Sequence, residues 1–357
     1  MTKPEIIIIG AGIIGAAIAW HLAASGARVT ILDAGEGGGV ATPNSFAWIN
    51  ASHGNPEPYF RLRTRSMAEW RRLAAAVPGL AVSWCGGLLW GLPHPELEAY
   101  VDRHGRWGYE LRLVEAAEAA RIEPRLTEMP SLAAYAPGEG AVEPVRAARA
   151  ILADAQRRGA AFLSARKVDG FLIRRGRIIG VRTWAGDLLG DEIVLAAGAE
   201  ITALARLAGV NVSLARSPGL LVHSRPVARR LLNGLVLAPT AHIRQTVDGR
   251  IVAGGDFGGS DPGVDADSAA AALFQSVQAM LQGGDALELD FHTVGYRPMP
   301  EDGFPIVGRV DGVRGLYIAV MHSGITLAPA IGRFVADELL DGRRDALLSP
   351  FGFERFR

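Results

Sequence analysis

Three glycines near the start of the chain, Gly10, Gly12 and Gly15, have the spacing of a phosphate-binding turn. The first glycine permits a tight turn, the second lets a pyrophosphate approach the backbone, and the third lets a helix pack closely against a strand. Unpaired N–H groups at the helix start then face the anion. Further along, Asp33 offers a carboxylate that can accept hydrogen bonds from ribose hydroxyls. These residues predict a dinucleotide-binding site; the alternative is a tight turn without a ligand.

The elements around these glycines fit that prediction. Residues 6–9 are four isoleucines, as expected of a parallel strand that is buried on both faces. Residues 13–25 predict a helix that ends at Gly26, and residues 28–33 predict a second strand. The glycine turn therefore lies inside a strand–helix–strand unit, which is the context in which the motif has meaning.

Composition excludes several other functions. The 37 basic and 37 acidic residues balance, so the chain lacks the basic bias of a general nucleic-acid binder. The arginine-rich segment 61–72 is interpreted as a helix with a solvated face. Cys85 is the only cysteine, which excludes an intrachain disulfide and a Cys-pair zinc or iron–sulfur site, and the eight histidines lack metal-ligand spacing. We therefore expect no metal site and no nucleic-acid partner.

The length and the N-terminal segment indicate a soluble protein. A chain of 357 residues fits two domains or one large one. Residues 6–20 carry no charge and resemble a signal peptide, but the lead MTKPE has no net positive charge. The apolar run also breaks at His21, short of the ~20 residues that span a bilayer. We therefore expect a cytoplasmic protein without a transmembrane segment.

The rest of the chain favours FAD over NAD as the dinucleotide. An NAD dehydrogenase would usually continue directly into further strand–helix units, whereas residues 34–57 are rich in small residues and contain no clear helix. Residues 191–200 predict a strand that closes in Ala-Ala-Gly, and residues 315–342 predict a strand, a turn at 322–324 and an amphipathic helix. The C-terminal part therefore offers a second helix N-terminus.

Five stretches of the chain carry a family resemblance. They are IIIIGAGIIGAAIAWHLAASGARVTILD, GAVEPVRAARAILADAQRRGA, DEIVLAAGAE, GYRPMPEDGFPIVG and GLYIAVMHSGITLAPAIG. On these the chain resembles the D-amino-acid oxidase superfamily of flavoproteins, most closely its glycine oxidase and sarcosine oxidase branch. The first stretch is shared by many flavoproteins, and the combination of GYRPMPEDGFPIVG with HSGITLAP is more specific.

The resemblance implies FAD as the cofactor and an α/β fold. A Rossmann-like FAD-binding domain of the glutathione-reductase type would carry an inserted α+β substrate domain, built on a mixed or antiparallel sheet. The FAD-binding domain would comprise residues 1–80, 140–212 and 300–357. The substrate domain would comprise residues 81–139 and 213–299.

The resemblance also assigns residues to the cofactor. The turn 322–326 would meet the flavin ring, although Ser323 or Thr326 could instead cap the helix. Segment 44–50 would line the flavin, although Trp48 could instead be core packing, and the backbone of Val168 would contact adenine. The full predicted set is Gly10, Gly12, Ile13, Ile14, Gly15, Asp33, Ala34, Thr42, Asn44, Ser45, Phe46, Ala47, Trp48, Val168, Ala197, Gly198, His322, Ser323, Gly324, Ile325 and Thr326.

The candidate catalytic residues are Arg297 and His322. In the family, an arginine at the place of Arg297 grips the substrate carboxylate; the alternative is a structural arginine paired with Glu301 or Asp302. His242 and Arg244 share one face of a predicted strand, which could be the pocket or solvent. The predicted substrate-binding set is Arg297, Tyr296, His242, Arg244, Trp48 and His53.

Two departures from the family refine the expected function. Sarcosine oxidases attach flavin through a cysteine just before the stretch that matches GYRPMPEDG, and no cysteine stands there, so FAD should be non-covalent. Those enzymes also carry a lysine near the flavin that is associated with oxygen activation. The only lysines here are Lys3 and Lys167, so the acceptor is either O2 or a redox partner.

The resemblance implies oxidation of the Cα–N bond of an amino acid or N-substituted amino acid. Hydride would pass to flavin N5, and the resulting imine would hydrolyse to a 2-oxo acid. Two alternatives stay open. The chain could be the flavin subunit of a multi-subunit amine dehydrogenase that passes electrons to a partner, or a tailoring flavoprotein that acts on a larger biosynthetic amine.

Overall fold

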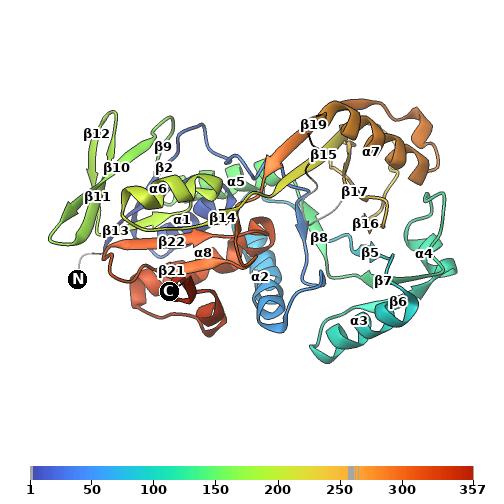
Figure 1. The fold of residues 1–357 in the computed structure, drawn as a ribbon, viewed down its shortest axis with the longest axis horizontal. Coiled ribbons are helices and arrows are strands. Elements are labelled where there is room, and N and C mark those ends of the chain that lie inside the picture. The colour runs from blue at the N-terminus through green and yellow to red at the C-terminus, as the bar shows by residue number, and fades with distance from the viewer. Residues whose placement is uncertain (1–2, 256–260, 262, 264, 357) are drawn as a thin grey trace.

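The computed structural model describes residues 3–255, 261, 263 and 265–356, and most of its strands lie in two large sheets. In Figure 1 the first sheet lies on the side of the molecule that holds both termini, and the second lies on the other side. The first has six strands, in the order β21 (Ile306–Arg309), β22 (Leu316–Val320), β13 (Glu192–Leu195), β1 (Glu5–Ile9), β2 (Arg28–Leu32) and β9 (Ala161–Leu163). All neighbours pair in parallel except β21 and β22.

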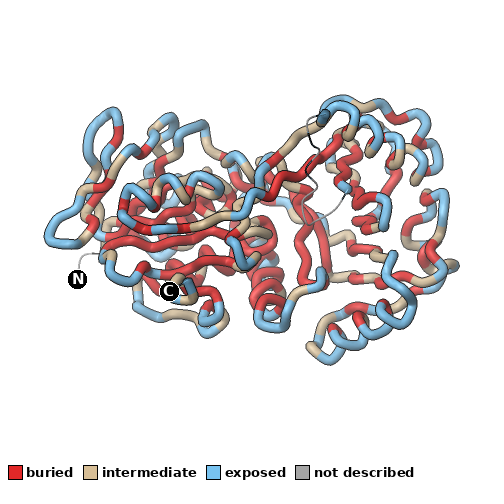
Figure 2. Tube along the Cα trace, viewed as in Figure 1, coloured by how far each residue is buried: buried red, intermediate tan, exposed pale blue. Residues whose placement is uncertain are grey.

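The four isoleucines of β1 are buried on both faces of this sheet, as the sequence predicts. Ile6 and Ile8 pack into a core with helices α1 (Ile13–Ala24), α2 (Glu57–Ala76), α5 (Pro144–Arg157) and α8 (Gly324–Asp341). Ile7 and Ile9 pack on the other face, against α6 (Ile201–Leu207) and a three-stranded sheet of β10 (Val168–Arg174), β11 (Arg177–Thr183) and β12 (Gly186–Leu189). Figure 2 shows this central sheet as the buried interior of its side of the molecule.

The second large sheet is mixed. Its order is β19 (Leu289–Tyr296), β15 (Pro218–Ser224), β18 (Ile251–Gly254), β17 (His242–Gln245), β16 (Leu235–Leu237), β5 (Gly87–Leu89), β7 (Leu132–Ala136) and β6 (Arg112–Glu115). Only β16 and β5 pair in parallel. Helices α3 (His94–Arg106), α4 (Ala116–Ile122) and α7 (Ala266–Met280) lie beside this sheet (Figure 1).

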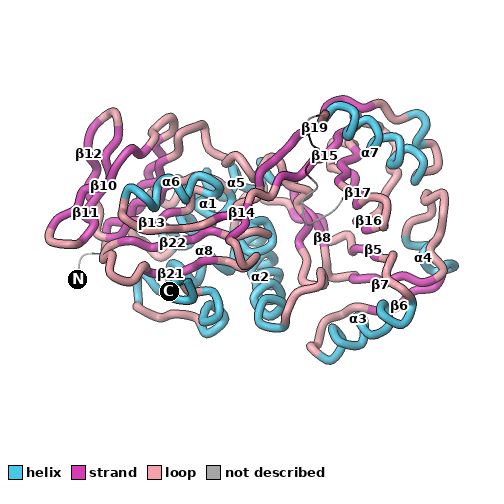
Figure 3. The backbone as a smooth tube through the Cα atoms, in the orientation of Figure 1, coloured by secondary structure: helices cyan, strands magenta, loops and turns pink. Residues whose placement is uncertain are grey.

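Short elements complete the fold. The strands β3 (Trp48–Ile49), β8 (Gly140–Val142) and β4 (Val82–Ser83) form a small sheet, and Figure 3 shows β8 between the two large sheets. The strands β14 (Leu214–Ala215) and β20 (Met299–Pro300) pair with each other. Four short 3-10 helices are η1 (Gly198–Glu200), η2 (Gly284–Ala286), η3 (Ala346–Phe351) and η4 (Phe353–Phe356).

The predicted fold class is confirmed: a Rossmann-like parallel sheet is combined with a mixed sheet and its own helices. The proposed domain boundaries remain a prediction. Among the described residues, no helix is long and apolar enough to cross a membrane. In the same part of the chain, no group of three or more His, Cys, Asp or Glu side chains could hold a metal ion.

Candidate active site

The glycine turn has two kinds of glycine. Gly10 has a φ of +104°, and a Cβ there would lie 2.5 Å from the Ala196 carbonyl oxygen. A Cβ on Gly15 would overlap the Gly10 carbonyl oxygen, so chain packing requires both glycines. Gly12 differs, because its φ is −71° and the nearest protein atom to a Cβ would be Thr42 Oγ1 at 3.5 Å. Packing therefore does not require glycine at position 12, and the space in front of it fits a close-approaching pyrophosphate.

The start of α1 is suited to an anion. The N-cap residue Gly12 has no side chain that could cap this helix, and the first turn carries no acidic residue. The Ile13 N–H donates to Thr42 Oγ1 at 3.3 Å, which ties segment 34–47 to the turn. The Gly324 backbone packs against Ile14, since a Cβ on Gly324 would lie 3.5 Å from Ile14 Cγ1. The N-terminal ends of α1 and α8 are therefore neighbours, and their positive dipole ends lie on the same side of the sheet.

Asp33 is held beside the glycine turn. Its carboxylate accepts hydrogen bonds from the Ala11 N–H at 2.6 Å and from the Gly35 N–H at 2.8 Å. A carboxylate has about four lone-pair sites, so these two bonds leave acceptor capacity for ribose hydroxyls. The Asp33 carbonyl accepts a hydrogen bond from the Arg166 N–H at 2.7 Å. This bond places the start of β10, where Val168 is buried, next to Asp33.

The other predicted dinucleotide residues surround this turn. Ala34 is exposed beside Asp33, and Ala197 and Gly198 follow β13 directly after Ala196, the residue that contacts Gly10. The carboxyl ends of β13, β1 and β2 therefore meet at one edge of the sheet, where α/β folds bind ligands. These residues fit FAD in their chemistry and their placement.

Segment 44–48 joins the two large sheets. Ala47 adopts a left-handed φ of 62°, and its N–H donates to Ser45 Oγ at 3.0 Å. The Phe46 ring meets the His242 ring edge-on at 4.5 Å between centroids. The Trp48 indole N–H donates to Glu139 Oε2 at 2.8 Å. Asn44 packs against β19, because a Cβ on Gly295 would overlap the Asn44 side chain.

The start of α8 has a strained residue. Ser323 has a left-handed φ of 58° and makes no side-chain cap, so the capping alternative is not seen at this residue. The Thr326 hydroxyl donates to the Trp48 carbonyl at 3.0 Å, and the Asn50 N–H donates to the same hydroxyl at 3.4 Å. Thr326 therefore holds β3 against α8, with Ile325 buried beside it.

Arg63 is a site residue that the sequence interpretation missed. It is 3% exposed, so the expected solvated face of segment 61–72 is wrong at this position. Its guanidinium donates to the Asn50 carbonyl at 3.0 Å, to Asn50 Oδ1 at 2.6 Å and to Ser323 Oγ at 2.8 Å. A signal existed, because Arg63 lies in helical register with Tyr59 and Trp70 on the apolar face of α2.

Arg297 lies near two histidines, His242 and His322. Its Nη1 donates to the Pro218 carbonyl at 2.6 Å, and a Cβ on Gly219 would lie 2.5 Å from its Nη2, so the guanidinium lies across β15. Burial and then the Arg297 charge lower the pKa of His242 to about 3. Burial, the Arg63 charge and the Arg297 charge lower the pKa of His322 to about 3.

His53 completes this cluster. It is exposed to solvent in the cleft, yet the surrounding protein and the Arg63 charge lower its pKa to about 4. The His322 Nδ1 lies 3.1 Å from Ser323 Oγ, which links the imidazole to Arg63 through one hydroxyl. At neutral pH the three imidazoles are uncharged while both guanidinium groups are charged. The site is therefore positive and attracts an anion.

The other predicted substrate residues lie in different surroundings. His242 and Arg244 are both buried, so their shared face is not a solvent face. Arg244 donates to the Phe46 carbonyl at 2.7 Å and to Glu143 at 3.0 Å, which supports segment 44–48. Tyr296 is 48% exposed, and its hydroxyl accepts from Arg216 at 3.4 Å. Asp302, the suggested structural partner of Arg297, pairs with Arg355 at 2.6 Å.

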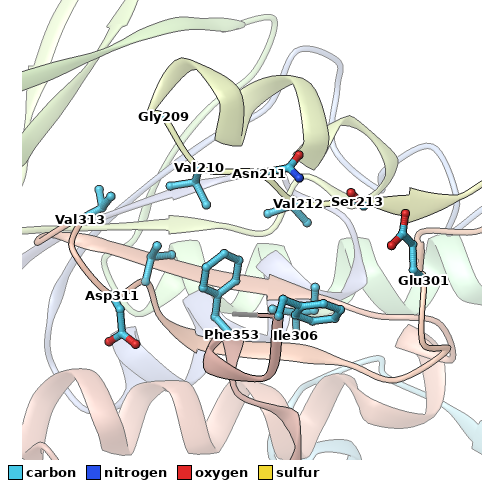
Figure 4. Close-up of a pocket in the computed structure, with 12 residues that line it drawn as sticks. Gly209, Val210, Asn211, Val212, Ser213, Glu301, Ile306, Asp311, Val313 and Phe353 are labelled. Carbon is cyan, nitrogen blue, oxygen red and sulfur yellow. The ribbon is translucent and has the colours of Figure 1, made fainter.

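A cleft of about 780 Å³ opens beside this cluster, lined in part by His53, His242, Trp90, Leu237, Glu96 and Arg103. A second cavity, of about 360 Å³, lies between residues 209–213, β21 and Phe353 (Figure 4). None of the predicted site residues lines the second cavity. Of the predicted substrate-binding residues, His53 and His242 line the larger cleft.

Comparisons with known proteins agree with this arrangement. A family model described as FAD dependent oxidoreductase matches residues 5–338. The chain is similar to a glycine oxidase of Pseudomonas aeruginosa, with 30% identity over 97% of each chain. It is similar to one subunit of an opine oxidase of Agrobacterium tumefaciens, with 27% identity over 100% of this chain and 98% of the relative. It also superimposes on L-proline dehydrogenase from P. horikoshii with a TM-score of 0.88, at 26% identity and covering 99% of each chain.

Proposed function

The chain belongs to the family of FAD-dependent oxidoreductases, and from that premise we propose that it oxidises the Cα–N bond of an amino acid or an N-substituted amino acid. The product is an imine, which water hydrolyses to a 2-oxo acid and an amine or ammonia. The observation that carries the proposal is the position of Arg297 on β15, near His242, which lines the cleft, and near enough to His322, just before α8, for its charge to lower both pKa values.

Arg297 is suited to hold the substrate carboxylate. A guanidinium is planar, keeps its charge and binds a carboxylate through two parallel N–H···O bonds. The bond to the Pro218 carbonyl and the contact with Gly219 fix the plane of the guanidinium. A fixed plane orients the carboxylate, and therefore also the Cα–H bond next to it.

The same charges favour a neutral substrate amine. The amine must have a free lone pair before its Cα–H can leave as hydride, since that lone pair becomes the C=N bond. The charged groups that act on His53, His242 and His322 are the guanidinium groups of Arg63 and Arg297. Positive neighbours lower the pKa of an amine, so a bound amine releases its proton more readily here.

A bound FAD would supply the acceptor for the hydride that leaves Cα, and therefore for the two electrons that the substrate loses. Gly12, the start of α1 and Asp33 would hold its pyrophosphate and ribose. Arg63 and the first turn of α8 supply positive potential beside the cleft, which stabilises negative charge that forms there. The hydroxyl of Ser323, fixed by Arg63, keeps the neutral His322 imidazole in place.

A second candidate follows from one relative. The Agrobacterium tumefaciens protein is named as one subunit of an opine oxidase, so a similar chain works as part of an assembly. In this second candidate function, the chain would be the flavin subunit of an amine dehydrogenase and would pass electrons to a partner protein rather than to O2.

An anaerobic titration tests the proposal. Holoprotein is mixed without oxygen with amino acids, N-alkyl amino acids and the corresponding amines that lack the carboxylate, while the flavin absorbance is followed. We expect bleaching by carboxylate-bearing amines, with a 2-oxo acid as the product. Failure of every carboxylate-bearing amine to bleach the flavin would overturn the proposal. Air is then admitted: rapid recovery of the colour supports O2 as acceptor, and slow recovery supports the second candidate.

A further inference from the structure

One face of helix α3 forms a wall of the large cleft. Glu96, Ala99 and Arg103 line the cleft, and their spacing of three and four residues places them on one side of the helix. Tyr100, on the same face, is buried, and its hydroxyl donates to the Ser52 carbonyl. At a rise of 1.5 Å per residue, Glu96 and Arg103 lie about 10 Å apart along the helix axis. The wall therefore carries a negative charge at one end and a positive charge at the other.

Arg103 has contacts that orient it without neutralising it. Its guanidinium carbon lies 5.9 Å from the centre of the Tyr100 ring and 5.9 Å from that of the Trp107 ring. Such contacts use the flat faces of the guanidinium and not its N–H edge. Within the described residues, no ion pair joins Arg103 to a carboxylate. Arg103 thus presents a positioned positive charge at the wall of the cleft.

The cleft connects Arg103 with the predicted carboxylate site. His242 lines the same cleft, and its ring lies across Gly254 of β18. Gly254 pairs with Leu221 of β15, two residues along the strand from Gly219, across which the Arg297 guanidinium lies. Arg103 and His242 thus line one cleft, and Arg297 lies beside its His242 wall.

Much of the remaining lining of the cleft is apolar. It consists of Leu89, Trp90, Leu92, Leu237 and Pro239, from β5, β16 and the loops that follow them. The volume of about 780 Å³ lies in the range that holds drug-sized ligands, so a single small amino acid would leave most of the cleft unfilled. An apolar chain fits such a wall, and a charge at its far end requires a partner.

We propose that Arg103 binds a second carboxylate of the substrate. The substrate class is then an amine with two carboxylates joined through an apolar chain, one at Arg297 and the other at Arg103. This inference rests on the proposed function and narrows it. The Glu96 carboxylate would repel a substrate carboxylate that lies near it on α3. The second carboxylate would therefore bind at Arg103 and not near Glu96.

Matched probes measure this preference. The probes are N-(carboxyalkyl)glycines of increasing chain length, each compared with the N-alkylglycine of matched length that ends in a methyl group. Binding is measured by calorimetry on holoenzyme reduced with dithionite under nitrogen, which cannot oxidise the probes. The variants are Arg103→Gln and, as a matched control, Arg106→Gln, which removes the same charge from the same helix at a residue that does not line the cleft.

In the wild type, we expect one length of N-(carboxyalkyl)glycine to bind roughly tenfold more tightly than its N-alkyl partner, as for a hydrogen bond between charged groups. Arg103→Gln should abolish that difference, and Arg106→Gln should retain it. The inference is overturned if no length shows the difference, or if the difference survives in Arg103→Gln.

Flavin reduction by the same probes in oxidised enzyme is scored separately. If no probe reduces the flavin while the difference that depends on Arg103 persists in binding, the proposed function fails and the second carboxylate site stands. If the N-alkylglycines reduce the flavin without any such difference in binding, the proposed function stands and the second site fails.

Discussion

The buried guanidinium of Arg63 should contribute strongly to stability, because it is the partner of three acceptors. Arg63→Met would leave the Asn50 carbonyl and Asn50 Oδ1 without this donor, and Asn50 is only 4% exposed. A buried acceptor left unsatisfied costs ~1–3 kcal/mol. Ser323 is half-buried, so water can replace the hydrogen bond to its hydroxyl. A buried charge carries a desolvation penalty, and its removal therefore offsets part of the lost stability. We expect a loss of about 2–4 kcal/mol in the free energy of unfolding.

Urea unfolding at a fixed excess of FAD measures this loss, and a separate FAD titration allows any change in cofactor affinity to be subtracted. Arg28→Met is the control, since Arg28 is 67% exposed and pairs with Glu5 at the surface at 3.4 Å. The control should change stability by about 1 kcal/mol or less. If Arg63→Met and Arg28→Met unfold at the same urea concentration, the reasoning from burial is refuted.

Three further predictions concern the cofactor and the histidines. FAD should be released into the supernatant when acid precipitates the protein, because no cysteine precedes GYRPMPEDG; a yellow pellet would contradict this. Gly12→Ala should weaken FAD binding in a titration and leave urea unfolding unchanged, whereas Gly15→Ala should destabilise the fold, since a Cβ on Gly15 would overlap the Gly10 carbonyl and a Cβ on Gly12 would overlap no protein atom. Because the folded pKa of His242 is about 3, the unfolded chain binds a proton there that the native state does not, so the contribution of His242 to stability is complete above pH ~6.5 and falls on acidification by ~1.4 kcal/mol per unit. His53 and His322 add to the same slope, so His242→Gln should reduce the slope of unfolding free energy against pH by about 1.4 kcal/mol per unit, and an unchanged slope would contradict this.

Local signals were sufficient to predict the dinucleotide half of the molecule. The glycine spacing, the buried isoleucine run and the helix stop at Gly26 each depend on neighbours in sequence, and β1, α1 and β2 form at those positions. The helix predicted to end near Gly342 ends there, with Gly342 in the left-handed conformation at a φ of 68°. Helix α7 begins at Ala266 because Asp265 caps it through the Ser268 N–H at 3.0 Å, which is again a contact between neighbours in sequence.

The interior contacts of the site could not be read in the same way. Arg63 meets Ser323 from a position 260 residues away in the chain, so no local pattern reports the pair. Glu139 is fully buried and accepts from the Trp48 indole and from the Ala51 and Ser52 N–H groups, although its own segment shows no core pattern. An arginine or a glutamate in sequence suggests a solvated residue, and only the fold supplies the partners that make burial possible.

The pairing of Arg297 with a substrate carboxylate is the central claim, and the anaerobic flavin-reduction rate tests it most directly. The rate is measured against substrate concentration for wild type, Arg297→Lys and Arg297→Met, with one amino acid that reduces the wild-type flavin and the amine that lacks its carboxylate. Lysine loses the planar fork, and an error of about 1 Å in placing Cα can cost roughly a hundredfold in rate. Methionine should cost more, because the carboxylate would then be buried without a charged partner. The account predicts that both variants lose activity toward the amino acid, keep their activity toward the simple amine and keep wild-type FAD absorbance. Equal losses on the two substrates would contradict it and would make Arg297 a residue that supports the fold.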